Sequence, residues 1–185
     1  MFDSLRQSLG RAGARFHFRA SRDAVMSFAA AFRANDRVLI LMPFYRLDDP
    51  AALGVLGPLG ARFSQNHITV MTPGPQLSIH QALPRANVIT FTTKELSAFF
   101  LPRRPLLDRV RGQDFDVAID LNLDFNLPSG YIGKECNARV RAGFAGPSAD
   151  VFYNLQVRME PPADGNRAYG RLVQCLQMFS RYEGI

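Results

Sequence analysis

From residue 37 onward the chain alternates regularly between apolar, β-rich runs and helix-like stretches, and this alternation constrains the fold more than any other feature. Helix-like stretches such as "PAALGVLGPLGARF", from Pro50, separate the runs. The strand-sized runs lie at 37–42, 67–71, 87–91, 115–121 and 139–144, with a further candidate at 152–157. Strands that alternate with helices form parallel sheets with right-handed crossovers. We therefore predict one α/β domain over 37–185, with a Rossmann-like, doubly wound, mainly parallel sheet of about five or six strands.

Length and composition agree with a single globular domain. The chain has 185 residues, of which 47% are hydrophobic and 21% charged. No apolar run approaches the roughly 18–20 residues of a membrane span, and no secretory signal is recognisable. The two cysteines, Cys136 and Cys175, form no CxxC pair, so we expect neither a disulfide framework nor a zinc site. We predict a cytoplasmic protein, either free or peripheral to the inner membrane.

Residues 1–36 form a separate, basic segment that we predict to be helical. Residues 1–34 contain six arginines against Asp3 and Asp23, which accounts for most of the net charge of +6. Between residues 23 and 34 the apolar side chains follow a nearly helical spacing. Two interpretations stay open: a helix that packs on its own domain, which we favour, or an amphipathic segment that contacts an anionic membrane or a partner. We expect no nucleic-acid partner, because no basic cluster is interleaved with aromatic residues.

The densest polar material lies in two loops that the predicted topology brings together. If the first four strands are ordered 3-2-1-4, the ligand crevice lies beyond the carboxyl ends of strands one and four. Its two lips are then "PFYRLDDP" after strand one and "NLDFNLPSG" after strand four. The candidate site residues in these loops are Tyr45, Arg46, Asp48, Asp49, Asn122, Asp124, Asn126 and Ser129.

Asp48 and Asp49 have a structural explanation and a chemical one. Aspartate is a favoured helix N-cap and proline is favoured at the first helical position, so Asp49 followed by Pro50 explains a helix start. Asp48 is then an exposed loop charge near the positive end of the helix. The alternative is a general base that removes a proton from an acceptor hydroxyl. The residues alone favour the cap.

The same loop argues against phosphate-bearing cofactors. No GxGxxG follows the first predicted strand, and no GxxxxGK[ST] occurs in the chain. Acid and proline stand where a phosphate would need glycine and backbone N–H groups. We expect neither NAD nor ATP there, and no cofactor at all. His17, His67 and His80 lack the spacing of metal ligands.

Three stretches resemble a known family. They are "RVLILM" with "DDPAALGVLGPLGARF", then "NHITVMTPGPQLSIHQALPRANVITF", and finally "DFDVAIDLNLDFNLPSGYIGKECNARVRAGF", which is the most specific. Together they resemble the N-terminal domain of family 9 glycosyltransferases, the lipopolysaccharide heptosyltransferase type. The resemblance implies half of a GT-B architecture, in which the N-terminal domain holds a sugar acceptor and a C-terminal domain binds the nucleotide-sugar donor. Asp49 falls on the aspartate proposed as the base of that family.

The resemblance covers only the first of the family's two domains, so we expect no donor domain. Our leading expectation is a stand-alone glycosyltransferase-like domain without complete catalytic machinery, which binds a sugar or glycolipid or serves as an interaction module. The alternative is an acceptor-binding half that works with a separate donor domain, a partner protein or as a homodimer, with Asp49 as general base. A third hypothesis is a docking scaffold that uses residues 1–34 at a membrane surface or on a partner.

Overall fold

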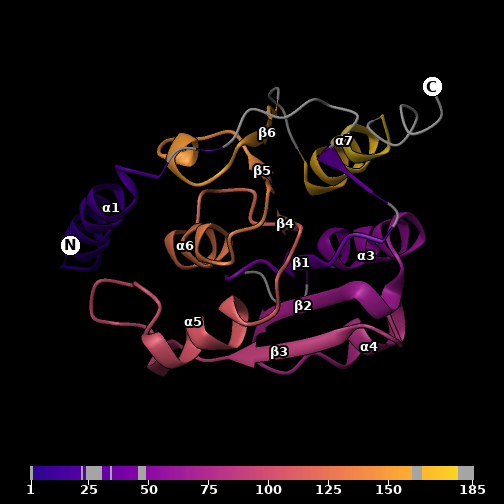
Figure 1. Ribbon diagram of the computed structural model, residues 1–185, viewed down its shortest axis with the longest axis horizontal. Coiled ribbons are helices and arrows are strands. Elements are labelled where there is room, and N and C mark those ends of the chain that lie inside the picture. The colour runs from indigo at the N-terminus through magenta and orange to yellow at the C-terminus, as the bar shows by residue number, and fades with distance from the viewer. Residues whose placement is uncertain are drawn as a thin grey trace.

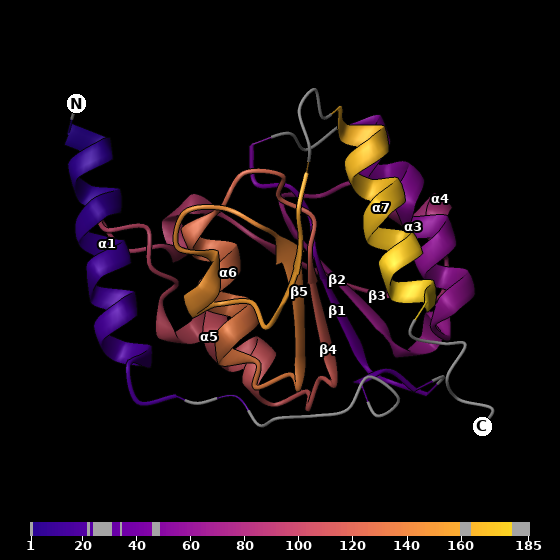
Figure 2. The same ribbon diagram turned by 90° about the horizontal axis from the view of Figure 1, so that it is seen from above.

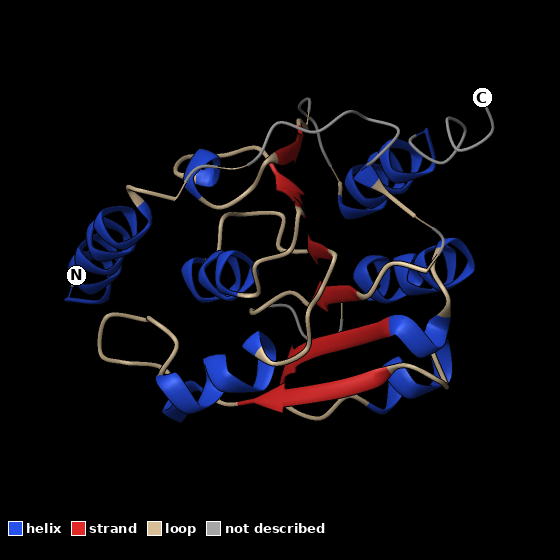
Figure 3. Cartoon of the chain, in the orientation of Figure 1, coloured by secondary structure: helices blue, strands red, loops and turns tan. Residues whose placement is uncertain are grey.

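The computed structural model describes residues 2–21, 23, 31–33, 35–45, 49–159 and 164–178. In these residues one six-stranded sheet has the order β3-β2-β1-β4-β5-β6, and every neighbouring pair is parallel (Figures 1 and 3). The strands are β1 (Val38–Leu41), β2 (Ile68–Pro73), β3 (Asn87–Phe91), β4 (Val117–Asp120), β5 (Val140–Phe144) and β6 (Leu155–Val157). The predicted Rossmann-like, doubly wound fold is thereby confirmed.

Helices cover both faces of the sheet (Figure 2). One face carries α3 (Pro50–Arg62), α4 (Leu77–Ala82) and α7 (Gly165–Met178). The other carries α5 (Arg104–Arg111) and α6 (Leu127–Glu135). In β1, Val38 and Ile40 pack on the first side, while Leu39 and Leu41 pack on the second. Burial on both faces explains why the strands read as continuous apolar runs rather than as alternating ones.

Thr92 followed by Glu95 is the sequence signature of a capping box and predicts the start of an α-helix, but that helix start is wrong. The two residues do form the capping box, but it governs only a 3-10 turn, Thr93–Glu95. Leu96 leaves that turn in an extended conformation, is buried, and forms an isolated antiparallel bridge with Pro102. Burying the Leu96 side chain therefore stops the helix one turn after it begins. The next helix, α5, starts only at Arg104.

The N-terminal segment begins with a helix, α1 (Phe2–Phe18), which lies against α6 (Figure 2). Ala14 is buried, and Phe18 packs against the rings of Tyr131 and Phe152. The helical spacing noted between residues 23 and 34 falls mostly outside the described residues. Phe32, near its end, is described and is fully buried in the core beside Phe63.

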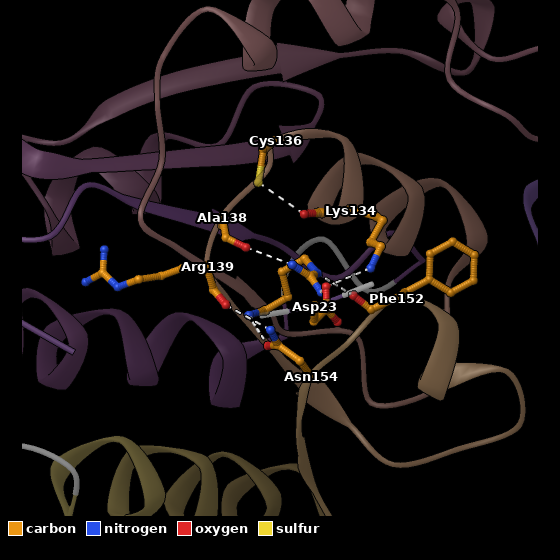
Figure 4. Close-up of polar contacts among 9 residues, drawn as sticks. Asp23, Lys134, Cys136, Ala138, Arg139, Phe152 and Asn154 are labelled. Atoms are coloured by element: carbon orange, nitrogen blue, oxygen red, sulfur yellow. Dashed lines mark hydrogen bonds and ion pairs between the residues drawn. The ribbon is translucent and has the colours of Figure 1, made fainter. Parts of the chain in front are cut away.

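Asp23 attaches this segment to the domain (Figure 4). Its Oδ1 accepts a hydrogen bond of 3.0 Å from Lys134 Nζ and lies 2.5 Å from Arg141 Nη2. Arg141 is buried and also donates to the carbonyl oxygens of Phe152 and Ala138, at 2.8 Å each. Burial would raise the pKa of Asp23, but the hydrogen bonds and charges of Lys134 and Arg141 outweigh it and lower that pKa. We call this arrangement the Asp23 clamp.

Candidate functional site

The carboxyl ends of β1 and β4 meet at the centre of the sheet, where the strand order reverses. β1 pairs with β2 on one side and with β4 on the other, which makes this the switch point at which doubly wound domains bind ligands. A cavity of about 100 Å³ opens there. It is lined by Pro43, Tyr45, Asp49, Asn122, Leu123, Asp124 and Tyr169. The structure therefore brings four of the predicted residues together, namely Tyr45, Asp49, Asn122 and Asp124.

Asp49 is both a helix cap and a wall of the cavity. Its backbone is extended, Pro50 follows at the first position of α3, and its Oδ1 accepts a hydrogen bond of 3.0 Å from the Ala51 N–H. The predicted cap is therefore confirmed. The cap uses one carboxylate oxygen, so capping does not prevent the side chain from meeting a ligand in the cavity.

Asn122 holds the two lips of the crevice together. Its Oδ1 accepts a hydrogen bond of 2.8 Å from the Phe44 N–H, across from the loop after β1. Its Nδ2 donates to Asp120 Oδ1 at 2.7 Å and to Ser129 Oγ at 3.1 Å. Because every polar atom of this buried amide is already engaged, Asn122 shapes the cavity more than it offers hydrogen bonds to a ligand.

The remaining candidates divide into two groups. Asn126 and Ser129 are buried: Asn126 Oδ1 caps α6 by accepting from the Ser129 N–H and Oγ, at 3.1 Å each. Neither lines the main cavity, although Asn126 lines a second hollow of about 30 Å³. Arg46 and Asp48 lie outside the described residues.

The second hollow adjoins the first through Tyr45, which lines both. Its other walls come from α1, through Gln7 and Arg11, from Phe100, and from the segment 125–128 that leads into α6. The Arg11 guanidinium lies 5.8 Å from the centre of the Phe125 ring. An element outside the doubly wound fold thus extends the site beyond the sheet.

Asp120, the last residue of β4, is buried beneath the loop that forms one wall of the cavity. Burial raises the pKa of its carboxyl to about 6, although hydrogen bonds from Tyr153 and Asn122 act in the opposite direction. The two donors are the Tyr153 hydroxyl, at 2.6 Å, and the Asn122 side chain and N–H. The Asp120 carboxylate accepts hydrogen bonds from Asn122 and so fixes the position of that side chain, but it does not line the cavity itself.

Tyr169 is a site residue that the sequence did not reveal. The spacing along α7 assigns it to an apolar stripe, and its ring does pack on Phe144 in the core. Tyr169 also lines the cavity, and its buried hydroxyl donates a hydrogen bond of 2.8 Å to the Leu121 carbonyl oxygen. One feature of the sequence could have indicated its second role: Tyr169 is a tyrosine in an otherwise apolar helix face. A buried tyrosine usually has a polar partner for its hydroxyl, which predicts a polar contact at this position.

The lining defines what the cavity can bind. Asp49 and Asp124 are hydrogen-bond acceptors when ionised, which suits hydroxyl groups and repels phosphates. Among the described side chains, no group of three His, Cys, Asp or Glu gathers as a metal site would require. Cys136 is unsuited to nucleophilic chemistry, since burial raises the pKa of its thiol to about 11.

Comparison of the chain with protein-family models, with curated proteins and with solved structures gives no match. Within the part of the chain that the structure describes, no helix combines the length and apolar character that a membrane crossing requires.

Proposed function

We propose that this chain is a glycosyltransferase-like domain that binds a neutral sugar, free or at the head of a glycolipid, in the cavity between the ends of β1 and β4. The observation that carries the proposal is the convergence of Asp49, Asp124 and two tyrosines at the switch point of the sheet. Carboxylates accept hydrogen bonds from sugar hydroxyls, and an aromatic ring offers a flat apolar face to sugar C–H groups. The likeness of three sequence stretches to an acceptor-binding domain supports the same proposal.

The size and charge of the cavity limit the ligand further. Pockets for drug-sized ligands measure about 300–1,000 Å³. A cavity of about 100 Å³ fits one sugar ring in part, with the rest of the ligand outside. Two carboxylates disfavour sugar phosphates and nucleotides at this point. The adjoining hollow beyond Tyr45 measures only about 30 Å³, so it has room for a substituent of the sugar and not for a second ring.

Binding can be tested on the full chain by saturation-transfer NMR with heptoses, hexoses and their phosphates. We expect signals from neutral sugars that weaken strongly in Asp124→Ala, whose side chain is exposed and does not support the fold. The matched control is Asp108→Ala, an exposed aspartate on α5 away from the cavity. A preference for the phosphates, or equal signals in wild type and Asp124→Ala, would contradict the proposal.

A second candidate function is the acceptor half of a glycosyltransferase, with Asp49 as general base. Its support is that the Asp49 carboxylate lines the same cavity. Asn and Ser preserve an N-cap but cannot act as a base at neutral pH. In a mixture reconstituted with a nucleotide-sugar-binding donor domain, we expect Asp49→Asn and Asp49→Ser to keep wild-type stability and lose transfer. Transfer that survives both substitutions would remove Asp49 from this role.

A further inference from the structure

Helix α1 has two different apolar faces. The inner face packs on the domain through the buried Gly10 and Ala14 and through Phe18. His17 adds a contact of 3.0 Å between its Nε2 and Glu135 Oε1. A helix that only covered its own domain would present polar side chains on its remaining surface.

The outer face of α1 is apolar as well. Leu5, Leu9 and Phe16 are 60%, 53% and 64% exposed. At about 100° per residue they fall within about 40° of one another around the helix axis. We call these three residues the outer stripe. Figures 1 and 2 both place α1 at the edge of the molecule beside α6, with its outward side away from the sheet. Such a stripe on a surface helix indicates a binding surface.

Arginines border the outer stripe. Residues 2–21 hold four arginines and one aspartate. Arg6, Arg15 and Arg19 are all exposed, and the Arg19 guanidinium lies 4.0 Å from the centre of the Phe16 ring. An apolar stripe flanked by exposed arginines is typical of helices that lie in the plane of a membrane surface, where the charged groups meet anionic lipid headgroups.

We propose that α1 is an interfacial anchor that docks the protein on an anionic lipid surface through the outer stripe. Charge favours this occupant over a second copy of the chain, because a two-fold interface would bring the same arginines of both copies together. Three side chains also offer much less than the ~800 Å² that each partner buries in a standard protein interface. A bilayer accepts a narrow stripe without any shape complementarity.

The anchor also lies beside the proposed sugar site. Gln7 and Arg11, on the same helix, line the second hollow that adjoins the cavity through Tyr45. This step rests on the proposed sugar binding: a glycolipid bound in this way would keep its tail in the bilayer while its head reaches the cavity. The membrane anchor itself depends only on the exposure and charge of α1.

Vesicle flotation with the full chain tests the anchor. The probes are vesicles of phosphatidylcholine alone and vesicles that also contain phosphatidylglycerol. We expect the wild type to float only with the anionic vesicles, and added salt to weaken the binding. The triple variant Leu5→Ser, Leu9→Ser, Phe16→Ser should bind about tenfold more weakly or worse. Arg6→Gln, Arg15→Gln, Arg19→Gln should lose the preference for anionic lipid.

The matched control removes exposed apolar side chains elsewhere. Leu77 and Met178, 75% and 59% exposed, lie on α4 and α7 over the opposite face of the sheet. The double variant Leu77→Ser, Met178→Ser should float like the wild type. Asp124→Ala should also float like the wild type, which would show that vesicle binding does not depend on the proposed sugar site. A wild type that ignores both vesicles, or a stripe variant that floats normally, would overturn the proposal. So would a wild-type dimer that the stripe variant converts to a monomer, which would assign the stripe to a second copy.

Discussion

The Tyr153 hydroxyl donates a hydrogen bond of 2.6 Å to Asp120 Oδ2, and the two residues join the loop before β6 to the end of β4. The pair is buried, so the ionised carboxylate lacks water and depends on its few donors. Burial raises the pKa of Asp120 to about 6 and, together with the Asp120 charge, raises that of Tyr153 well above its ordinary value. A titrating group therefore lies directly beneath the loop that carries Asn122.

The Asp120 pKa makes stability depend on pH. A carboxyl with a raised pKa in the folded state stabilises fully at low pH, and this contribution is lost as the pH rises from about 4 through about 6. Asp120→Asn mimics the protonated form. We expect it to match the wild type near pH 4 and to exceed its free energy of unfolding by up to about 3 kcal/mol near pH 7. Urea unfolding across this range measures the difference.

Tyr153→Phe provides the control for this pH dependence. It removes the strongest donor to the Asp120 carboxylate, so the pKa of Asp120 should rise further. The loss of stability should then continue above pH 6. If the wild type and Asp120→Asn showed parallel pH profiles, the carboxylate would not be the titrating group.

The Asp23 clamp predicts a second pH effect, of opposite sign. The lowered pKa of Asp23 stabilises the fold above the ordinary pKa of aspartate and ceases to do so as the pH falls through the lowered value. Asp23→Asn leaves Lys134 and Arg141 buried without their shared counter-charge. We expect a loss of about 2 kcal/mol, below the 3–5 typical of fully buried pairs because Asp23 is about one-third exposed.

Asp3→Asn is the matched control for the clamp, since Asp3 belongs to the same segment and its ion pair with Arg6 is exposed. Its free energy of unfolding should stay within about 0.5 kcal/mol of the wild-type value. Lys134→Met should recover part of the loss in the Asp23→Asn background. Equal effects of Asp23→Asn and Asp3→Asn would show that the clamp does not hold.

Two glycines of α1 form a further matched pair. A Cβ at Gly10 would lie 2.2 Å from the Phe99 carbonyl oxygen, so Gly10→Ala must push α1 away from the loop 97–101. A Cβ at Gly13 meets nothing within 4 Å. We expect Gly10→Ala to destabilise by about 1–3 kcal/mol and Gly13→Ala to stabilise by about 0.5–1 kcal/mol. Amide hydrogen exchange along α1 should speed up in the first and slow down in the second.

Comparing Asn122→Ala with Asp124→Ala should distinguish a residue that maintains the shape of the cavity from one that contacts the ligand. It removes the bond to the Phe44 N–H and leaves Asp120 with one donor fewer, inside the protein. We expect a cost of about 2–3 kcal/mol and weaker sugar binding. Asp124→Ala should weaken binding with no comparable loss of stability. Thermal unfolding with the NMR binding assay distinguishes the two, and unchanged stability in Asn122→Ala would contradict its bridging role.

The sheet could be predicted from local patterns because each strand is buried on both faces. Val38 to Leu41 have no solvated side, so the run is apolar throughout and easy to recognise. The start of α3 was equally predictable, since two adjacent residues mark it: Asp49 is the N-cap and Pro50 is the first residue of the helix. The position of the cavity followed from the strand order rather than from any motif.

Contacts between distant segments had no local signal. Tyr153 and Asp120 are 33 residues apart, and Asp23 and Lys134 are 111 apart. Nothing near either residue marks its partner. The position of α1 was also hidden, because Gly10 and Gly13 weaken the helical pattern of its residues while the clearer spacing lies downstream. The spacing along α7 predicts that Tyr169 lies in the core, and its ring does, but this pattern gives no sign that the residue also lines the cavity.

The pairing of β1 with β4 has a consequence for synthesis on the ribosome. Val38 pairs with Val117, and α3 packs on α7, which is the last described helix. The central strand is made before β4 and keeps one edge unpaired until β4 emerges, and α3 stays partly uncovered until α7 is complete. A nascent chain of this topology exposes an aggregation-prone edge while residues 42–116 are synthesised, so its yield should depend on chaperone supply and elongation rate as well as on final stability.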